Sequence, residues 1–259
     1  MSVQITRRLK PEEEELLRKR EELVAIRATL AERELELVDL RSQLAGFEGR
    51  YLRQVGALYA ELDEWKARVS ELRARHDPSA ATSARAQLDR EQARQTYEDA
   101  HGAASKTTDF TPSPELKSLF REVAKRLHPD FCRDAADLER RTRFMAEANR
   151  AYETGDAEAL QRILEEYHDG ADAVEGEGIG AELIRIIRQI SQARERVVAI
   201  ENELATLRQS EIALLKKQAE EKEREGQDLL AELAMAVRER IDQTKREYEV
   251  LAEQEVYPE

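Results

Sequence analysis

An apolar residue recurs at every seventh position over the first part of the chain. The positions are Leu16, Leu23, Leu30, Leu37, Leu44, Tyr51, Leu58, Trp65 and Leu72. A second apolar series lies three residues further on at Ile26, Leu40 and Phe47, and then four residues further on at Val55, Leu62 and Val69. A heptad series of this length predicts a coiled-coil helix, and the change from three to four predicts a small phase adjustment inside it. We expect this helix over residues 10–76, because Pro78 disfavours helical backbone at the residue before it.

A second coiled-coil helix is expected over residues 179–255. Its apolar positions alternate spacings of three and four: Leu183, Ile186, Ile190, Ala193, Val197, Ile200, Leu204 and Leu207. The charged segment 216–228, which contains Gly226, interrupts the series, and it predicts either a bend or local loosening of the helix or only a polar-faced helix turn. Between the two helices we expect a linker at 77–113 with a polar helix near 83–100, and a Gly-rich hinge at 169–178.

Residues 114–168 predict a separate small helical domain, called here the central module. Ser113 is a suitable N-cap for a helix that begins at Pro114 and runs to about Leu127. The apolar face of this helix is Leu116, Leu119, Phe120, Val123 and Leu127. After a turn at His128-Pro129-Asp130 (the HPD turn), a helix from about Ala136 to Glu153 offers Leu138, Phe144, Ala148, Ala151 and Tyr152 to the first. Gly155 and Asp156 then end that helix and cap a third one, Ala157 to Tyr167.

The central module resembles the J-domain family, the co-chaperone domains that stimulate ATP hydrolysis by DnaK-type chaperones. LFREVAKRLHPD (119–130) looks like the family's second helix with its HPD loop, and RFMAEANRAYE (143–153) looks like its third helix. The resemblance implies that His128, Pro129 and Asp130 engage the chaperone. It also implies that an electropositive helix face is supplied by Lys117, Arg121, Lys125 and Arg126.

The module departs from the family pattern in three places. DFTPSP offers no clear counterpart of the family's first helix, the basic motif of its last helix is absent, and Glu122 stands where the family usually has a base. The resemblance covers only residues 114 to about 160. We therefore expect a reduced J-like core, or one that a neighbouring helix such as 83–100 completes.

Composition and charge restrict the other functional classes. The formal net charge of −13 opposes binding to nucleic acid or to an anionic membrane. A single cysteine, Cys132, excludes an internal disulfide and a zinc-type cysteine cluster, and the four histidines are not at metal-binding spacing. We find no secretion signal and no apolar run long enough to span a membrane, so we expect a cytoplasmic protein. We expect no catalytic residues, no metal and no cofactor.

Two functions remain in competition. The first is a J-domain co-chaperone that recruits a DnaK-type chaperone, with the coiled coil selecting a client or partner that the sequence does not identify. The alternative is a coiled-coil scaffold that keeps a degenerate J-like domain. A stimulated-ATPase assay separates the two.

The expected fold is all-α. The two long helices have similar lengths, so we predict that they form an antiparallel coiled-coil hairpin with the central module at its tip. This arrangement would place Leu44 near Glu211 and Leu23 near Glu232. The competing arrangement is a parallel homodimer, in which each helix pairs with its own copy.

Overall fold

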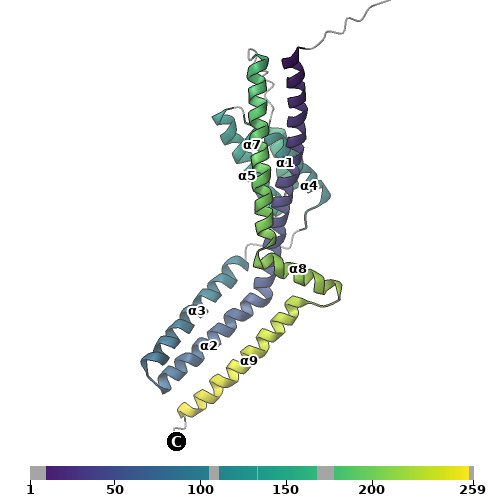
Figure 1. Ribbon diagram of the computed structural model, residues 1–259. Coiled ribbons are helices and arrows are strands. Elements are labelled where there is room, and N and C mark those ends of the chain that lie inside the picture. Colours follow the sequence, from purple (N-terminus) through teal and green to yellow (C-terminus); the bar gives the residue numbers. More distant parts are fainter. Residues whose placement is uncertain (1–9, 105–110, 133, 168–177, 257–259) are drawn as a thin grey trace, which may run out of the picture. The chain divides into compact units, whose positions relative to one another are not determined.

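The structure is a computed structural model, and it describes residues 10–104, 111–132, 134–167 and 178–256. Every regular element in these residues is a helix, which confirms the all-α class (Figure 1). The chain divides into two compact units. The first contains Met1–Ser42 and Phe110–Arg208, and the second contains Gln43–Asp109 and Gln209–Glu259. The expected Gly-rich hinge lies, apart from Gly178, outside the described residues.

In the first unit, α1 (Pro11–Tyr51) as far as Ser42 pairs with α7 (Ile179–Arg208). The seam buries the predicted heptad residues of both helices. Its buried members are Leu16, Leu23, Leu30, Leu37, Phe131, Ile186, Ile190, Ala193, Ile200 and Leu204. Burial of these apolar side chains stabilises the pairing of the two helices.

The ion pairs along this seam fix its direction. Arg20 pairs with Glu182 and Arg41 with Glu203, and both pairs are 162 residues apart. Glu22 pairs with Arg194 and Glu36 with Arg208, and both of these pairs are 172 residues apart. A constant difference in residue number means that α1 and α7 run parallel, whereas an antiparallel pair would keep the sum constant. Figure 1 shows both helices starting at the same end.

The predicted antiparallel hairpin is therefore wrong, and so is the placement of the central module at its tip. In this unit the module packs along the side of α1, and the chain returns to begin α7 beside the start of α1. The module consists of α4 (Pro114–Leu127), the 3₁₀ turn η2 (Pro129–Phe131), α5 (Ala135–Thr154) and α6 (Ala157–Glu166).

The local signals in the module behave as predicted. Ser113 accepts a hydrogen bond from the amide of Leu116 and caps α4, and Asp156 caps α6 in the same way. Gly155, at φ 75°, ends α5 in the left-handed conformation that glycine tolerates best. One core prediction is wrong: the side chain of Leu138 is exposed.

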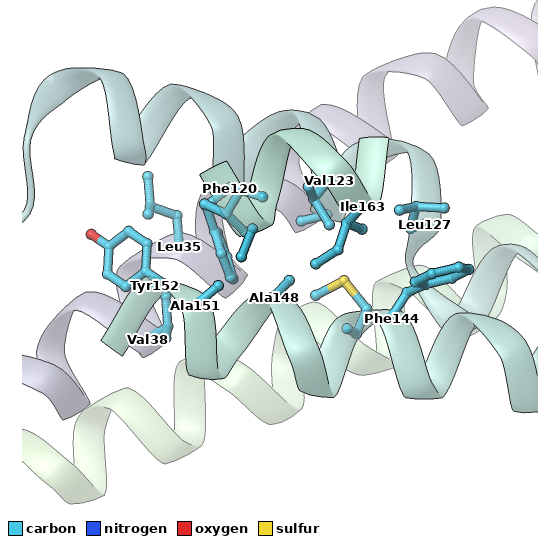
Figure 2. Close-up of a cluster of buried hydrophobic side chains, with 14 of the residues drawn as sticks. Leu35, Val38, Phe120, Val123, Leu127, Phe144, Ala148, Ala151, Tyr152 and Ile163 are labelled. Atoms are coloured by element: carbon cyan, nitrogen blue, oxygen red, sulfur yellow. The ribbon is translucent and has the colours of Figure 1, made fainter. Parts of the chain in front are cut away.

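The core of the module extends onto α1. Figure 2 shows Leu35 and Val38 of α1 beside Phe120 and Tyr152 of the module. Ala31 of α1 joins the same cluster. The helix that completes the reduced core is thus α1, and not the helix expected near 83–100. That helix packs elsewhere, in the second unit.

In the second unit, α2 (Ala57–His76) packs against α3 (Ala80–Ala104) and α9 (Leu229–Val256). Asp63 accepts a hydrogen bond from Thr96, and Asp89 accepts one from Ser70, so α3 runs antiparallel to α2. Glu61 pairs with Lys245 and Arg73 with Glu247, so α9 runs parallel to α2. The predicted polar helix thus forms one side of a three-helix arrangement and is longer than 83–100.

The phase adjustment predicted within the first heptad series has a physical counterpart. Between α1 and α2 the helix opens into a π turn, η1 (Leu52–Gly56), which inserts one extra residue between Phe47 and Val55. Gly56 fits this turn because it has no side chain. A Cβ at this position would lie only 3.0 Å from Cδ2 of Leu52.

The predicted break in the second long helix is also present. α8 (Glu211–Arg224) ends before Gly226, whose φ is 78°, and α9 begins at Leu229. An additional break, not predicted, separates α7 from α8, where Ser210 caps the new helix. Among the described residues, no helix has both the length and the apolar character needed to cross a membrane.

Candidate functional site

The HPD turn has a defined local conformation. α4 ends at Leu127, and Pro129 then starts the single 3₁₀ turn η2. Nδ1 of His128 accepts a hydrogen bond from the amide of Asp130 over 3.1 Å. A neutral ring that accepts at Nδ1 carries its proton on Nε2, so the turn itself selects the tautomer of His128.

The other ring nitrogen of His128 faces α1. Nε2 lies 3.1 Å from Oε1 of Glu34, and the same oxygen accepts a hydrogen bond of 2.8 Å from Nε of Arg196 in α7. The side chain of His128 is only 4% exposed and that of Glu34 only 9%. Burial raises the pKa of Glu34, but the hydrogen bonds from His128 and Arg196 outweigh this effect and lower its pKa. Glu34 is therefore a buried carboxylate that joins the turn to both long helices.

Phe131 attaches the turn to the same two helices through apolar and polar contacts. Its ring is buried in the α1–α7 seam, and the guanidinium of Arg27 in α1 lies 4.6 Å from the ring centroid. The side-chain amide of Gln189 in α7 donates a hydrogen bond of 3.2 Å to the carbonyl of Phe131. The turn is thus held by contacts at both ends.

Asp130 is placed differently. Its Oδ2 is buried and accepts no hydrogen bond from the residues that the structure describes, although Nδ1 of His128 lies 3.6 Å away. Burial raises the pKa of Asp130, and the charge of the nearby Arg196 opposes this only in part. A buried carboxylate oxygen without a donor costs free energy, on the order of 1–3 kcal/mol.

Arg141 of α5 contacts the backbone at the end of α4 and in the HPD turn. Its buried guanidinium pairs with Asp137 over 2.8 Å and donates to the carbonyl of Arg126 over 2.8 Å. It also reaches the carbonyl of His128 and the hydroxyl of Tyr167. Since the last carbonyls of a helix have no partner within the helix, Arg141 closes the C-terminal end of α4 and fixes where the turn begins.

The four predicted basic residues fall into two groups. Lys117 pairs with Asp39 over 2.9 Å and Arg121 with Glu32 over 2.8 Å, so both face acids of α1. Lys125 and Arg126 lie in the last turn of α4 and are exposed. Arg126 pairs with Glu122, the acid that departs from the J-domain pattern.

The described residues also bear on the expectations for metal ligands and for Cys132. No group of three or more potential metal ligands occurs among them. Cys132, two residues after Asp130, is partly buried, and burial raises the pKa of its thiol, which lowers its nucleophilic reactivity. Four residues that build the site were missed in the sequence: Glu34, Arg141, Gln189 and Arg196.

Comparisons of the chain with known proteins give no match: no family model, no curated protein and no solved structure is similar to it. The resemblance to J-domains therefore depends on the motif and its order within the central module.

Proposed function

We propose that this protein is a co-chaperone whose central module recruits a DnaK-type chaperone and stimulates its ATP hydrolysis. The observation that carries the proposal is the order of elements around the HPD turn. A basic amphipathic helix leads directly into His128-Pro129-Asp130, and α5 returns against it, so that the tripeptide forms the turn of a helical hairpin, in the order that the J-domain family shows. The coiled coils would select a client or partner, and a DnaK-type partner would place the protein in the cytoplasm.

Each residue of the turn has a role in this proposal. Pro129 restricts the backbone, His128 holds the amide of Asp130, and Asp130 offers its carboxylate to a basic group of the chaperone. Lys125 and Arg126 attract an acidic partner over longer distances. In this proposal the central module binds the chaperone, and the chaperone itself hydrolyses ATP.

The test is the steady-state ATP turnover of a purified DnaK-type chaperone with and without this protein. We expect stimulation by the wild type and at least a tenfold loss with Asp130→Asn. The matched control is Asp242→Asn, which changes an exposed aspartate of α9 and should leave stimulation unchanged. Equal stimulation by the wild type and Asp130→Asn would contradict the proposed role of the turn.

A specific observation favours a second candidate, the coiled-coil scaffold with a degenerate J-like domain. His128 is buried against Glu34, so the tripeptide makes an internal contact between α1, α7 and the module. If this contact is its whole function, His128→Gln lowers the free energy of unfolding and no form of the protein changes the turnover of the chaperone.

A further inference from the structure

We propose that α1 and α7 hold the HPD turn in a closed state and that Glu34 is the latch that keeps it closed. The inference rests on the proposed co-chaperone function and adds its regulation. An autoinhibitory contact of this kind makes chaperone recruitment depend on separating the turn from the two long helices.

The two long helices restrict access to the HPD turn. The side chain of His128 is 4% exposed, and Phe131 next to the turn is buried in the α1–α7 seam. Glu34, Arg196 and the rest of this seam cover the side chains of His128 and Asp130. A chaperone that binds these two residues must therefore displace the seam. The contacts come from three segments of the chain, so the closed state requires α1, α7 and the module together.

Acidic residues of α1 also neutralise part of the basic face of α4. Glu32 and Asp39 of α1 pair with Arg121 and Lys117, the two basic residues on the covered side of α4. These acids occupy the position that an acidic surface of the chaperone would take. The first long helix therefore competes with the partner for the same charges.

The polar contacts of the closed turn differ in how much they stabilise it. Lys117 and Arg121 are about one-third or more exposed, and such ion pairs contribute little to stability. No donor among the residues that the structure describes reaches the buried Oδ2 of Asp130, which disfavours the closed state. The buried carboxylate of Glu34, with donors from both His128 and Arg196, is a polar contact of the turn that offsets this cost. Loss of that carboxylate should shift the turn toward an open state.

The native Cys132 provides a readout that does not need a chaperone. It directly follows η2, its amide donates to the carbonyl of Pro129, and it is partly buried. Release of the turn should expose its thiol. We expect Glu34→Ala to raise the rate of Cys132 modification by an aromatic disulfide reagent at least fivefold, and to raise stimulation of the chaperone ATPase at a fixed low concentration by a similar factor.

Glu36→Ala is the matched control. Glu36 lies two positions beyond Glu34 on α1, and its ion pairs are with Arg33 of α1 and Arg208 of α7. It should leave both the Cys132 rate and the stimulation near wild-type values. If Glu34→Ala does not fold, as judged by circular dichroism, Gln189→Ala removes the donor to the carbonyl of Phe131 and should give a smaller rise in the Cys132 rate.

The Cys132 rate and the ATPase stimulation together distinguish the role of Glu34 as a latch from the proposed co-chaperone function. Equal Cys132 rates in the wild type and in the folded latch variant would overturn the latch. A faster Cys132 rate with no stimulation of the ATPase by Glu34→Ala would overturn the co-chaperone function and leave the release of the turn standing. A rise in both supports both.

Discussion

The hydroxyl of Tyr152 in α5 lies 3.0 Å from the carboxylate of Asp39 in α1 and donates a hydrogen bond to it. Tyr152 is fully buried, and Lys117 of α4 pairs with the other oxygen of the same carboxylate. Three helices therefore meet at Asp39, and the docking of the central module on α1 has a polar component as well as an apolar one.

Tyr152→Phe should lower the free energy of unfolding in urea by about 1 kcal/mol, because Asp39 loses one donor while the ring still fills its site. Burial and the nearby Asp39 raise the pKa of Tyr152 above its ordinary value. The hydrogen bond thus stabilises the folded chain below pH ~10, and this contribution is lost as pH rises above ~10, where the unfolded phenol ionises. The wild type should lose more stability above pH ~10 than Tyr152→Phe does. The control is the exposed Tyr97, where the same substitution should have little effect.

Chemical crosslinking tests the direction of the coiled coil in the first unit. In a Cys132→Ser background, a short bismaleimide should link cysteines at 20 and 182, and cysteines at 41 and 203, within one chain. The exchanged pairs, 20 with 203 and 41 with 182, should not link, because about 30 Å of helix separates the two levels at 1.5 Å per residue. Efficient linking of the exchanged pairs would show that α1 and α7 run antiparallel.

Two neighbouring arginines that share Asp137 should differ in importance. Arg141→Met removes a buried guanidinium and leaves Asp137 and two carbonyls of the turn without it, so we expect a loss of about 3–5 kcal/mol in the free energy of unfolding. Arg140→Met removes a mostly exposed partner of the same carboxylate and should cost less than about 1 kcal/mol. Equal losses for the two variants would mean that Arg141 does not hold the end of α4.

Two glycines should respond to alanine with opposite signs. Gly226 has a φ of 78°, so Gly226→Ala should destabilise the chain by roughly 1 kcal/mol through backbone strain alone, since the space around it is open. Gly180 lies in the first turn of α7 and is also in open space, so Gly180→Ala should stabilise by a few tenths of a kcal/mol to about 1 kcal/mol. Thermal unfolding of the two variants checks both signs.

The local features of this fold were readable from the sequence because they depend on neighbours in the chain. Ser113, Gly155 and Asp156 cap or end helices through contacts within a few residues. The spacing of apolar residues shows the change of heptad phase between Phe47 and Val55, and the π turn accommodates the extra residue. The sequence also located the HPD turn between two helices.

The direction of the coiled coil was not readable in the same way. A heptad pattern specifies which face is buried, but it is the same for parallel and antiparallel pairs. The direction is determined by the flanking charges, such as Arg20 with Glu182 and Glu22 with Arg194. These pairs can be recognised only after the two helices have been aligned.

The latch residue Glu34 was missed for a related reason. Ala31, Leu35 and Val38 form a second apolar stripe on α1, outside the heptad series, and this stripe predicts a second partner for the helix. Recognising it would have placed the module on α1 and Glu34 beside His128. Neither Glu34 nor Arg196 carries a signal of its own, because isolated charged residues are common on coiled coils.

The parallel pairing of α1 with α7 also has a consequence for biosynthesis. Partners in this seam are 162 or 172 residues apart, so the leucines of α1 leave the ribosome long before α7 exists. At roughly 5–20 residues per second, synthesis from Ser42 to Arg208 takes on the order of ten to thirty seconds. During that time the stripe from Leu16 to Leu37 is without its partner, and the same stripe on a neighbouring nascent chain fits it. Slow translation of residues 43–208 should therefore increase the yield of misassembled parallel dimers.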